Sequence, residues 1–114
     1  MADEHPLSRV ELHILLSVVD RPRHGYAILQ EAEERTQGKP GFEIPTLYRA
    51  LRRLRDIGLI RVAPTLERDT DERREYWGAT ALGRRALDAE LARMEMALAV
   101  GRARTKPATS GGRK

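Results

Sequence analysis

The sequence has no cysteine, few aromatic residues and no long hydrophobic segment. Without cysteine the chain has no disulfide bond, no thiolate metal site and no thiol nucleophile, which suits a reducing compartment. No apolar run approaches the roughly 20 residues that a membrane-spanning helix requires. The first residues, which include Asp3, Glu4 and Pro6, show no signal-peptide pattern. We therefore expect a cytoplasmic protein with no membrane partner.

Recognisable catalytic and metal-binding patterns are also missing. His5, His13 and His24 are too scattered along the sequence to suggest a metal site. No serine or acidic residue stands in a familiar nucleophile arrangement. We therefore predict no enzymatic activity and no cofactor.

The sequence is rich in charge, and the charge is unevenly distributed. Charged residues make up 33% of the 114 residues, with 21 basic against 17 acidic side chains. Only three of the basic residues are lysine, so arginine is favoured throughout the chain, and we expect Arg21, Arg35 and Arg93 to be ordinary surface residues. The segment 44–61 has five arginines and one acid, and its net charge equals the +4 of the whole chain. Localised positive charge of this kind points to nucleic acid.

This basic segment is predicted to be an amphipathic helix. One face carries apolar residues at helical spacing, namely Leu47, Leu51, Leu54 and Ile57. At about 100° per residue, Arg49 and Arg52 point away from this stripe, and Arg53 and Arg55 lie on its flanks. The pattern favours a helix that packs by one face and contacts nucleic acid by the other. An ordinary solvated face is the alternative interpretation.

Local signals divide the rest of the chain into elements. Ser8 and Glu11 form a capping box, and Thr80 caps the last helix. Pro45 and Gly58 suit the first turn and the end of the basic helix. The other predicted elements are helices over residues 9–19, 24–36 and 80–104, and strands over residues 59–63 and 74–79 that form a hairpin. The fold class is therefore mainly α with a small β-hairpin (α+β), in the order of a winged helix-turn-helix.

The last helix is predicted to pair with a second copy. Its apolar residues Leu87, Leu91, Met94 and Leu98 repeat at spacings of four, three and four, as in paired helices. A second apolar edge, Ala86, Ala89, Met96 and Val100, is available to its own domain, and packing within the monomer alone is the alternative. We therefore expect a winged helix-turn-helix domain over residues 1–79, a dimerisation helix over 80–104 and a disordered basic tail over 105–114.

The sequence resembles the PadR-like family of winged helix-turn-helix transcriptional regulators from Pro6 to Leu98. The resemblance lies in the basic helix (Pro45, Thr46, Leu47, Tyr48, Arg49, Ala50, Leu51, Leu54, Gly58, Leu59, Ile60), the second helix (His24, Gly25, Tyr26) and the last junction (Tyr76, Thr80, Gly83, Leu87). Trp77, Gly78 and Ala79 depart from the tyrosine, basic and aliphatic residues usual there. The single last helix is similar to that of the smaller members, which are homodimers. The resemblance implies a DNA-binding repressor that occupies a palindromic operator.

The basic helix supplies most of the predicted DNA contacts. Arg49 is the candidate for base readout, because a guanidinium group pairs with O6 and N7 of guanine. Arg52 and Arg53 extend the basic surface. The hydroxyl of Thr46 either contacts a phosphate or caps the helix. For Tyr48, the resemblance implies a phosphate contact, and simple packing of the ring is the alternative.

Other contacts are expected outside this helix. Arg73 and Arg74 in the hairpin touch the DNA backbone at most, because the acids of the hairpin tip make it net negative. The resemblance also implies a small apolar effector at the dimer interface, where Trp77, Met94, Met96 and Leu98 are available. A core role is nevertheless favoured for Trp77, because the last helix has no aromatic residue to stack with it. An alternative function is a winged-helix interaction module that binds an acidic protein instead of specific DNA.

Overall fold

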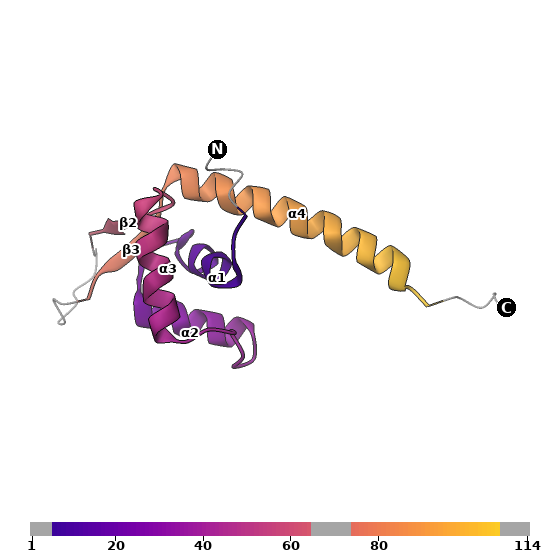
Figure 1. Cartoon of the computed structure of the whole chain (residues 1–114), viewed down its shortest axis with the longest axis horizontal. Helices are drawn as coiled ribbons and strands as arrows, with labels where there is room; N and C mark the ends of the chain where they lie inside the picture. Colours follow the sequence, from indigo (N-terminus) through magenta and orange to yellow (C-terminus); the bar gives the residue numbers. More distant parts are fainter. Residues whose placement is uncertain (1–5, 65–73, 108–114) are drawn as a thin grey trace.

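The computed structural model describes residues 6–64 and 74–107 of the chain. Within these ranges the elements are α1 (Arg9–Val18), β1 (Arg23–His24), α2 (Gly25–Arg35), α3 (Ile44–Asp56), β2 (Ile60–Ala63), β3 (Tyr76–Ala79) and α4 (Ala81–Thr105). Helices α1, α2 and α3 and the small sheet form one domain, from which α4 projects (Figure 1). The predicted fold class is confirmed. No helix in the described ranges is long and apolar enough to cross a membrane.

The helices begin where their capping residues stand. Ser8 and Glu11 form the predicted capping box, in which each side chain accepts a hydrogen bond from the other residue's backbone N–H. Nδ1 of His24 accepts from the N–H of Ala27 at 3.2 Å and caps α2. Oγ1 of Thr80 accepts from the N–H of Gly83 at 3.0 Å and caps α4. These side chains satisfy N–H groups that a helix start leaves without partners.

The basic helix α3 has sharply defined ends. Pro45 lies in its first turn, where the missing N–H costs nothing. At the other end Gly58 adopts a φ of +84°, a conformation that glycine adopts without a Cβ clash. The N–H groups of Gly58 and Leu59 return to the carbonyls of Arg55 and Leu54, which is the Schellman arrangement. Both predicted boundary signals are confirmed.

The sheet has three antiparallel strands in the order β1-β3-β2. Val62 of β2 and Arg23 of β1 both lie opposite Trp77 of β3. The predicted hairpin is present, but its strands begin at Ile60 and Tyr76, later than expected. The short strand β1 was not predicted. Most of the predicted polar turn lies outside the described residues.

The hydrophobic core lies between α1, α2, α3 and the sheet. The side chain of Trp77 is only 3% exposed, so its core role is confirmed. Helix α4 adds Ala86 and Leu87 to the same core. The other large members are Val10, Ile14, Leu15, Val18, Ile28, Leu47, Leu51, Leu54, Leu59 and Ile60. Burial of one complete face of α3 fixes which of its residues face outward.

Only the first half of α4 packs on the domain. Gly83, Ala86 and Leu87 are buried, whereas every residue from Leu91 to Val100 is exposed. The described structure accordingly measures 65 × 33 × 24 Å along its principal axes. The helix continues through Thr105, one residue beyond its predicted end at residue 104. Residues 108–114 of the predicted disordered tail lie outside the described residues.

Candidate nucleic-acid interface

The outward face of α3 carries two available guanidinium groups, those of Arg49 and Arg52. Both side chains are exposed, while Leu47, Ala50, Leu51 and Leu54 bury the opposite face. Nη2 of Arg49 donates to Oγ1 of Thr46 at 3.2 Å. Within residues 6–64 and 74–107, the side chain of Arg52 makes no hydrogen bond or ion pair. These groups are therefore available to a nucleic acid that approaches this face.

Thr46 does not cap α3, so that alternative is wrong. The helix begins at Ile44, and the residue in the N-cap position is Glu43, whose side chain makes no capping hydrogen bond. The hydroxyl of Thr46 instead accepts from Arg49 on the next turn. This contact shows that the polar groups of Thr46 and Arg49 lie on the same side of α3.

The ring of Tyr48 joins α3 to the start of α2. Gly25, the first residue of α2, leaves room for the ring: a Cβ at Gly25 would lie only 2.7 Å from Cζ of Tyr48. The side chain is nevertheless 39% exposed. Packing and phosphate contact are therefore compatible at this position. Tyr26, which follows Gly25 in the sequence, is 56% exposed.

Arg53 differs from Arg49 and Arg52 because it forms an ion pair inside the domain. Its Nε donates to Oε2 of Glu11 at 2.8 Å. The Glu11 side chain is 3% exposed and that of Arg53 is 49% exposed. The pair thus joins the basic helix to α1.

The wing contributes fewer described candidates. Arg74 is exposed just before β3, and Arg73 lies outside the described residues. Arg61 is exposed on β2 directly opposite Gly78 of β3. Its side chain makes no hydrogen bond or ion pair in the part of the chain that the structure describes. In the sequence Arg61 adds to the charge of the basic segment, but no pattern there marks it as a candidate contact.

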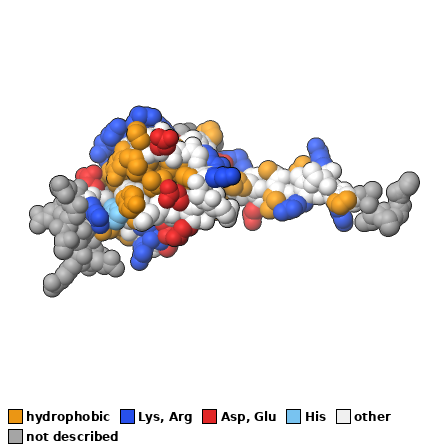
Figure 2. Space-filling view, turned by 90° about the horizontal axis from the view of Figure 1, so that it is seen from below, with side chains coloured by type: hydrophobic (Ala, Val, Ile, Leu, Met, Phe, Trp, Pro, Cys, Tyr) orange, Lys and Arg blue, Asp and Glu red, His pale blue; other side chains and the backbone are white. Residues whose placement is uncertain are grey.

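The predicted dimer residues of α4 fall into two groups. Leu87 is 3% exposed and belongs to the core of its own chain, so we remove it from the proposed interface. Leu91, Met94 and Leu98 are 36%, 44% and 57% exposed. Together with Glu95 and Ala97 they line a shallow hollow on α4. Figure 2 shows hydrophobic side chains along this projecting half of the helix.

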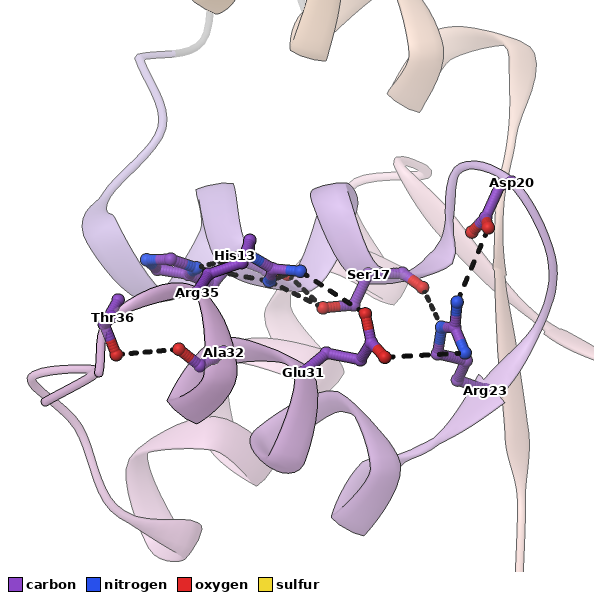
Figure 3. Close-up of polar contacts among 8 residues, drawn as sticks. All are labelled: His13, Ser17, Asp20, Arg23, Glu31, Ala32, Arg35 and Thr36. Carbon is purple, nitrogen blue, oxygen red and sulfur yellow. Dashed lines mark hydrogen bonds and ion pairs between the residues drawn. The ribbon is translucent and has the colours of Figure 1, made fainter. Parts of the chain in front are cut away.

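A polar network behind the interface ties α1 to α2 (Figure 3). Nη2 of Arg35 donates to Oγ of Ser17 at 2.8 Å and to the carbonyl of His13 at 3.1 Å, and its Nε donates to Nδ1 of His13 at 3.3 Å. Nε of Arg23 donates to the carbonyl of Ser17 at 2.6 Å. Glu31 lies between the two arginines, 3.7 Å from Arg35 and 3.9 Å from Arg23. Arg35 is therefore not an ordinary surface residue, contrary to expectation.

The environment of His13 favours its neutral form. Burial lowers the pKa of His13, and the positive charges of Arg35 and Arg9 lower it further. Because an arginine can only donate, Nδ1 must be the accepting nitrogen and Nε2 must carry the proton. Among the described residues no group of three or more histidine and acidic side chains could hold a metal ion.

Comparison with known proteins assigns the chain to a family. The model of the transcriptional regulator PadR-like family matches residues 14–89, well over half of the chain. The chain belongs to this family. The matched range of this PadR-like protein contains α2, α3, the sheet and the packed part of α4.

Solved structures share the fold of this PadR-like protein. A PadR family regulator from Clostridium difficile is 22% identical with a TM-score of 0.73, covering 84% of this chain and 97% of its own. A transcriptional regulator from Clostridium thermocellum is 24% identical with a TM-score of 0.70, and the match covers 85% of this chain and 90% of that protein. A PadR-like regulator from Bacillus cereus is 18% identical with a TM-score of 0.71, and the match covers 87% of this chain and 93% of that protein. Comparison with curated protein sequences gave no match.

Some residues of this PadR-like protein make contacts that no local sequence pattern predicts. Glu11 was predicted only as half of a capping box, and its contact with Arg53 spans 42 residues. Tyr26 was noted only for its family resemblance. A glycine before a tyrosine at a helix start is the signal that could have drawn attention to this surface, because glycine permits close packing.

Proposed function

We propose that this PadR-like protein is a transcriptional repressor that binds a palindromic operator as a homodimer. The observation that carries the proposal is the outward face of α3, where Arg49 and Arg52 are exposed and form no ion pair among the described residues. A helix fixed by one buried face presents such groups in a constant direction. In a winged helix-turn-helix, that direction is the major groove.

The residues of this face have different roles in the proposal. Arg49 reads a base edge through two parallel hydrogen bonds to guanine, a contact that discriminates by about 1–3 kcal/mol. Arg52 adds a second cation on the same side of the helix. Tyr48 and Thr46 donate hydroxyl hydrogen bonds to phosphates and so set the register of the helix. Arg73 and Arg74 approach the backbone from the wing.

The projecting half of α4 supports the homodimer. Leu91, Met94 and Leu98 repeat on one side of a helix that its own domain leaves uncovered. Pairing with the same stripe of a second copy would remove these side chains from water. A two-fold dimer carries two recognition helices, so its operator has two inverted half-sites. Occupation of such a site within a promoter blocks transcription.

The same stripe is where a small apolar effector would bind. Trp77 is buried in the core, so the lining would come from α4 residues such as Met94 and Leu98. An effector that changed the pairing of the two α4 helices would change the spacing of the recognition helices and release the operator.

A DNA titration tests the proposal. The purified protein is titrated with the DNA upstream of its own gene and with a scrambled control, each at two salt concentrations. We expect a preference for the upstream DNA that persists at the higher salt, where counterion release contributes less. Arg49→Ala should abolish the preference, losing about 1–3 kcal/mol of discrimination per contacted base pair.

The matched control is Arg85→Ala, which removes an exposed arginine from α4. Its binding preference should equal that of the wild type. Equal weak binding to both DNAs that vanishes with salt would contradict the proposal. It would favour the interaction module that binds an acidic protein.

A further inference from the structure

Glu11 is a buried carboxylate whose described hydrogen bonds connect α1 to the basic helix. The residue is 2% exposed. Its Oε1 accepts from the N–H of Ser8 at 2.9 Å, and its Oε2 accepts from Nε of Arg53 at 2.8 Å. A capping box needs only the first of these contacts. A buried negative charge is costly without a charged partner, and Arg53 supplies one.

The other end of this ion pair is open to solvent. The side chain of Arg53 is 49% exposed, and its Nε is the atom that binds Glu11. Its two terminal amino nitrogens make no hydrogen bond within the described residues. The guanidinium group is planar and rigid. Fixing Nε against Glu11 therefore also fixes the direction in which the terminal groups point.

Arg53 occupies one of two flanks of α3. At about 100° per residue, Arg53 and Tyr48 lie about 140° apart around the helix, and Arg49 and Arg52 lie between them. Tyr48 is on the flank that meets α2 at Gly25, and Arg53 is on the flank that meets α1 at Glu11. A major groove is bounded by two phosphate backbones. A helix that reads bases with its central residues brings one flank towards each backbone.

We propose that Glu11 is a positioning residue for DNA binding, which holds Arg53 so that its terminal amino groups meet a phosphate on the α1 side of the groove. The inference rests on the proposed DNA-binding function and assigns a specific phosphate contact and its support. Glu11 itself does not touch DNA. Its carboxylate holds the Arg53 side chain in one orientation before DNA binds. Binding then costs less side-chain entropy than it would with a freely rotating arginine.

The direction in which Glu11→Gln changes DNA affinity distinguishes a positioning role from a simple effect of charge. Glu11→Gln removes a negative charge close to the DNA-binding face, so electrostatics alone would strengthen DNA binding. The glutamine oxygen can still accept from Ser8, but the charge that holds Arg53 is gone. Positioning therefore predicts weaker binding, by about two- to tenfold, the cost of ordering one side chain.

Glu43→Gln is the matched control. Glu43 is an exposed acid at the start of the same helix, and its side chain makes no hydrogen bond or ion pair among the described residues. The chemical change is identical, but no arginine depends on it. We expect Glu43→Gln to leave DNA affinity unchanged or to raise it, opposite to Glu11→Gln.

Arg53 variants complete the test. Arg53→Ala should weaken binding to upstream and scrambled DNA alike, by roughly tenfold, since a phosphate contact carries no sequence information. The salt dependence should fall by about one unit per recognition helix. In the Arg53→Ala background, Glu11→Gln should have no further weakening effect on binding. This cancellation would show that Glu11 affects DNA binding through Arg53.

Each outcome decides the inference. Circular dichroism confirms the fold of each variant. If Glu11→Gln does not fold, Arg53→Lys decides, because one ammonium group cannot hold Glu11 and reach a phosphate in a fixed direction. Unchanged affinity in Arg53→Ala or Arg53→Lys, or an unchanged or raised affinity in Glu11→Gln, would overturn the inference while the DNA-binding function stands. A wild type that binds no DNA would overturn both.

Discussion

At the scale of single residues, the contact between α1 and α2 includes a histidine whose surroundings favour its neutral form. His13 accepts hydrogen bonds from Arg35 through Nδ1, lies near Arg9 and has the ring of Phe42 beside it at 6.1 Å. Protonation would place a proton on the nitrogen to which Arg35 donates. It would also bring two positive charges together, because arginine stays charged at every relevant pH. The contact between α1 and α2 is therefore sensitive to acid.

This sensitivity gives a prediction for stability against pH. Burial and the neighbouring arginines lower the pKa of folded His13 below its usual 6.5. Between this lowered pKa and about pH 6.5, the unfolded chain binds more protons than the folded protein. The contribution of His13 to the free energy of unfolding is therefore constant above about pH 6.5 and decreases as the pH falls below that value. His13→Asn, whose oxygen can still accept from Arg35, should flatten this decrease. Urea denaturation at pH 7.5, 6.5 and 5.5 measures it.

The loss of stability between pH 7.5 and 5.5 can be attributed to His13 because carboxylates titrate at lower pH. The hydrogen bond from Arg93 lowers the pKa of Glu90, so that group titrates in more acid solution. Equal loss of stability in wild type and His13→Asn between pH 7.5 and 5.5 would show that another group is responsible.

At the scale of elements, the junction between α3, β2 and α4 leaves very little space. Oγ1 of Thr80 donates to the carbonyl of Gly58 at 2.6 Å and also caps α4. One turn later, Gly83 packs directly on the backbone of Leu59: a Cβ there would lie 3.0 Å from the carbonyl carbon of Leu59 and closer still to its oxygen. Backbone cannot move aside as a side-chain end can. The absence of a side chain at Gly83 therefore sets how closely α4 docks.

Gly83→Ala should destabilise the protein by about 1–3 kcal/mol, the usual cost of overpacking. Helix propensity alone would predict the opposite, a gain of up to about 1 kcal/mol. Gly101→Ala is the control, because Gly101 lies in the same helix with open space around it. Urea denaturation at one protein concentration should therefore give opposite signs for the two variants. Equal stabilisation by both would show that the Leu59 contact does not limit the docking of α4.

Local signals predicted most of the elements and few of the contacts between them. The ends of α3 follow from Pro45 and Gly58, whose effects act within one helical turn. Strand β1 was missed because two residues show no alternation, and its pairing with β3 depends on tertiary contacts. Arg35 was misassigned for the same reason, since its partners His13 and Ser17 are 22 and 18 residues away.

At the scale of the whole molecule, the sequence predicted the apolar stripe of α4 but not where the domain stops covering it. Leu87 enters the core of its own chain, whereas Leu91, Met94 and Leu98 on the same side of the helix are exposed. The division depends on how far α1 and the sheet extend beside α4, which spacing alone does not reveal. The stripe thus continues from an intramolecular core into a surface that a second copy can cover.

The double variant Leu91→Asp, Leu98→Asp tests this surface. Both side chains lie outside the core, so the domain should keep its fold and its circular dichroism spectrum. A dimer would have to bury unpaired carboxylates, which should raise its dissociation constant by about a hundredfold or more. Sedimentation velocity should therefore show a wild-type dimer and a monomeric variant. Met96→Asp is the control, because Met96 is 67% exposed on the opposite side of α4 and should leave the dimer intact. A monomeric wild type, or equal dissociation by Met96→Asp, would contradict pairing through this stripe.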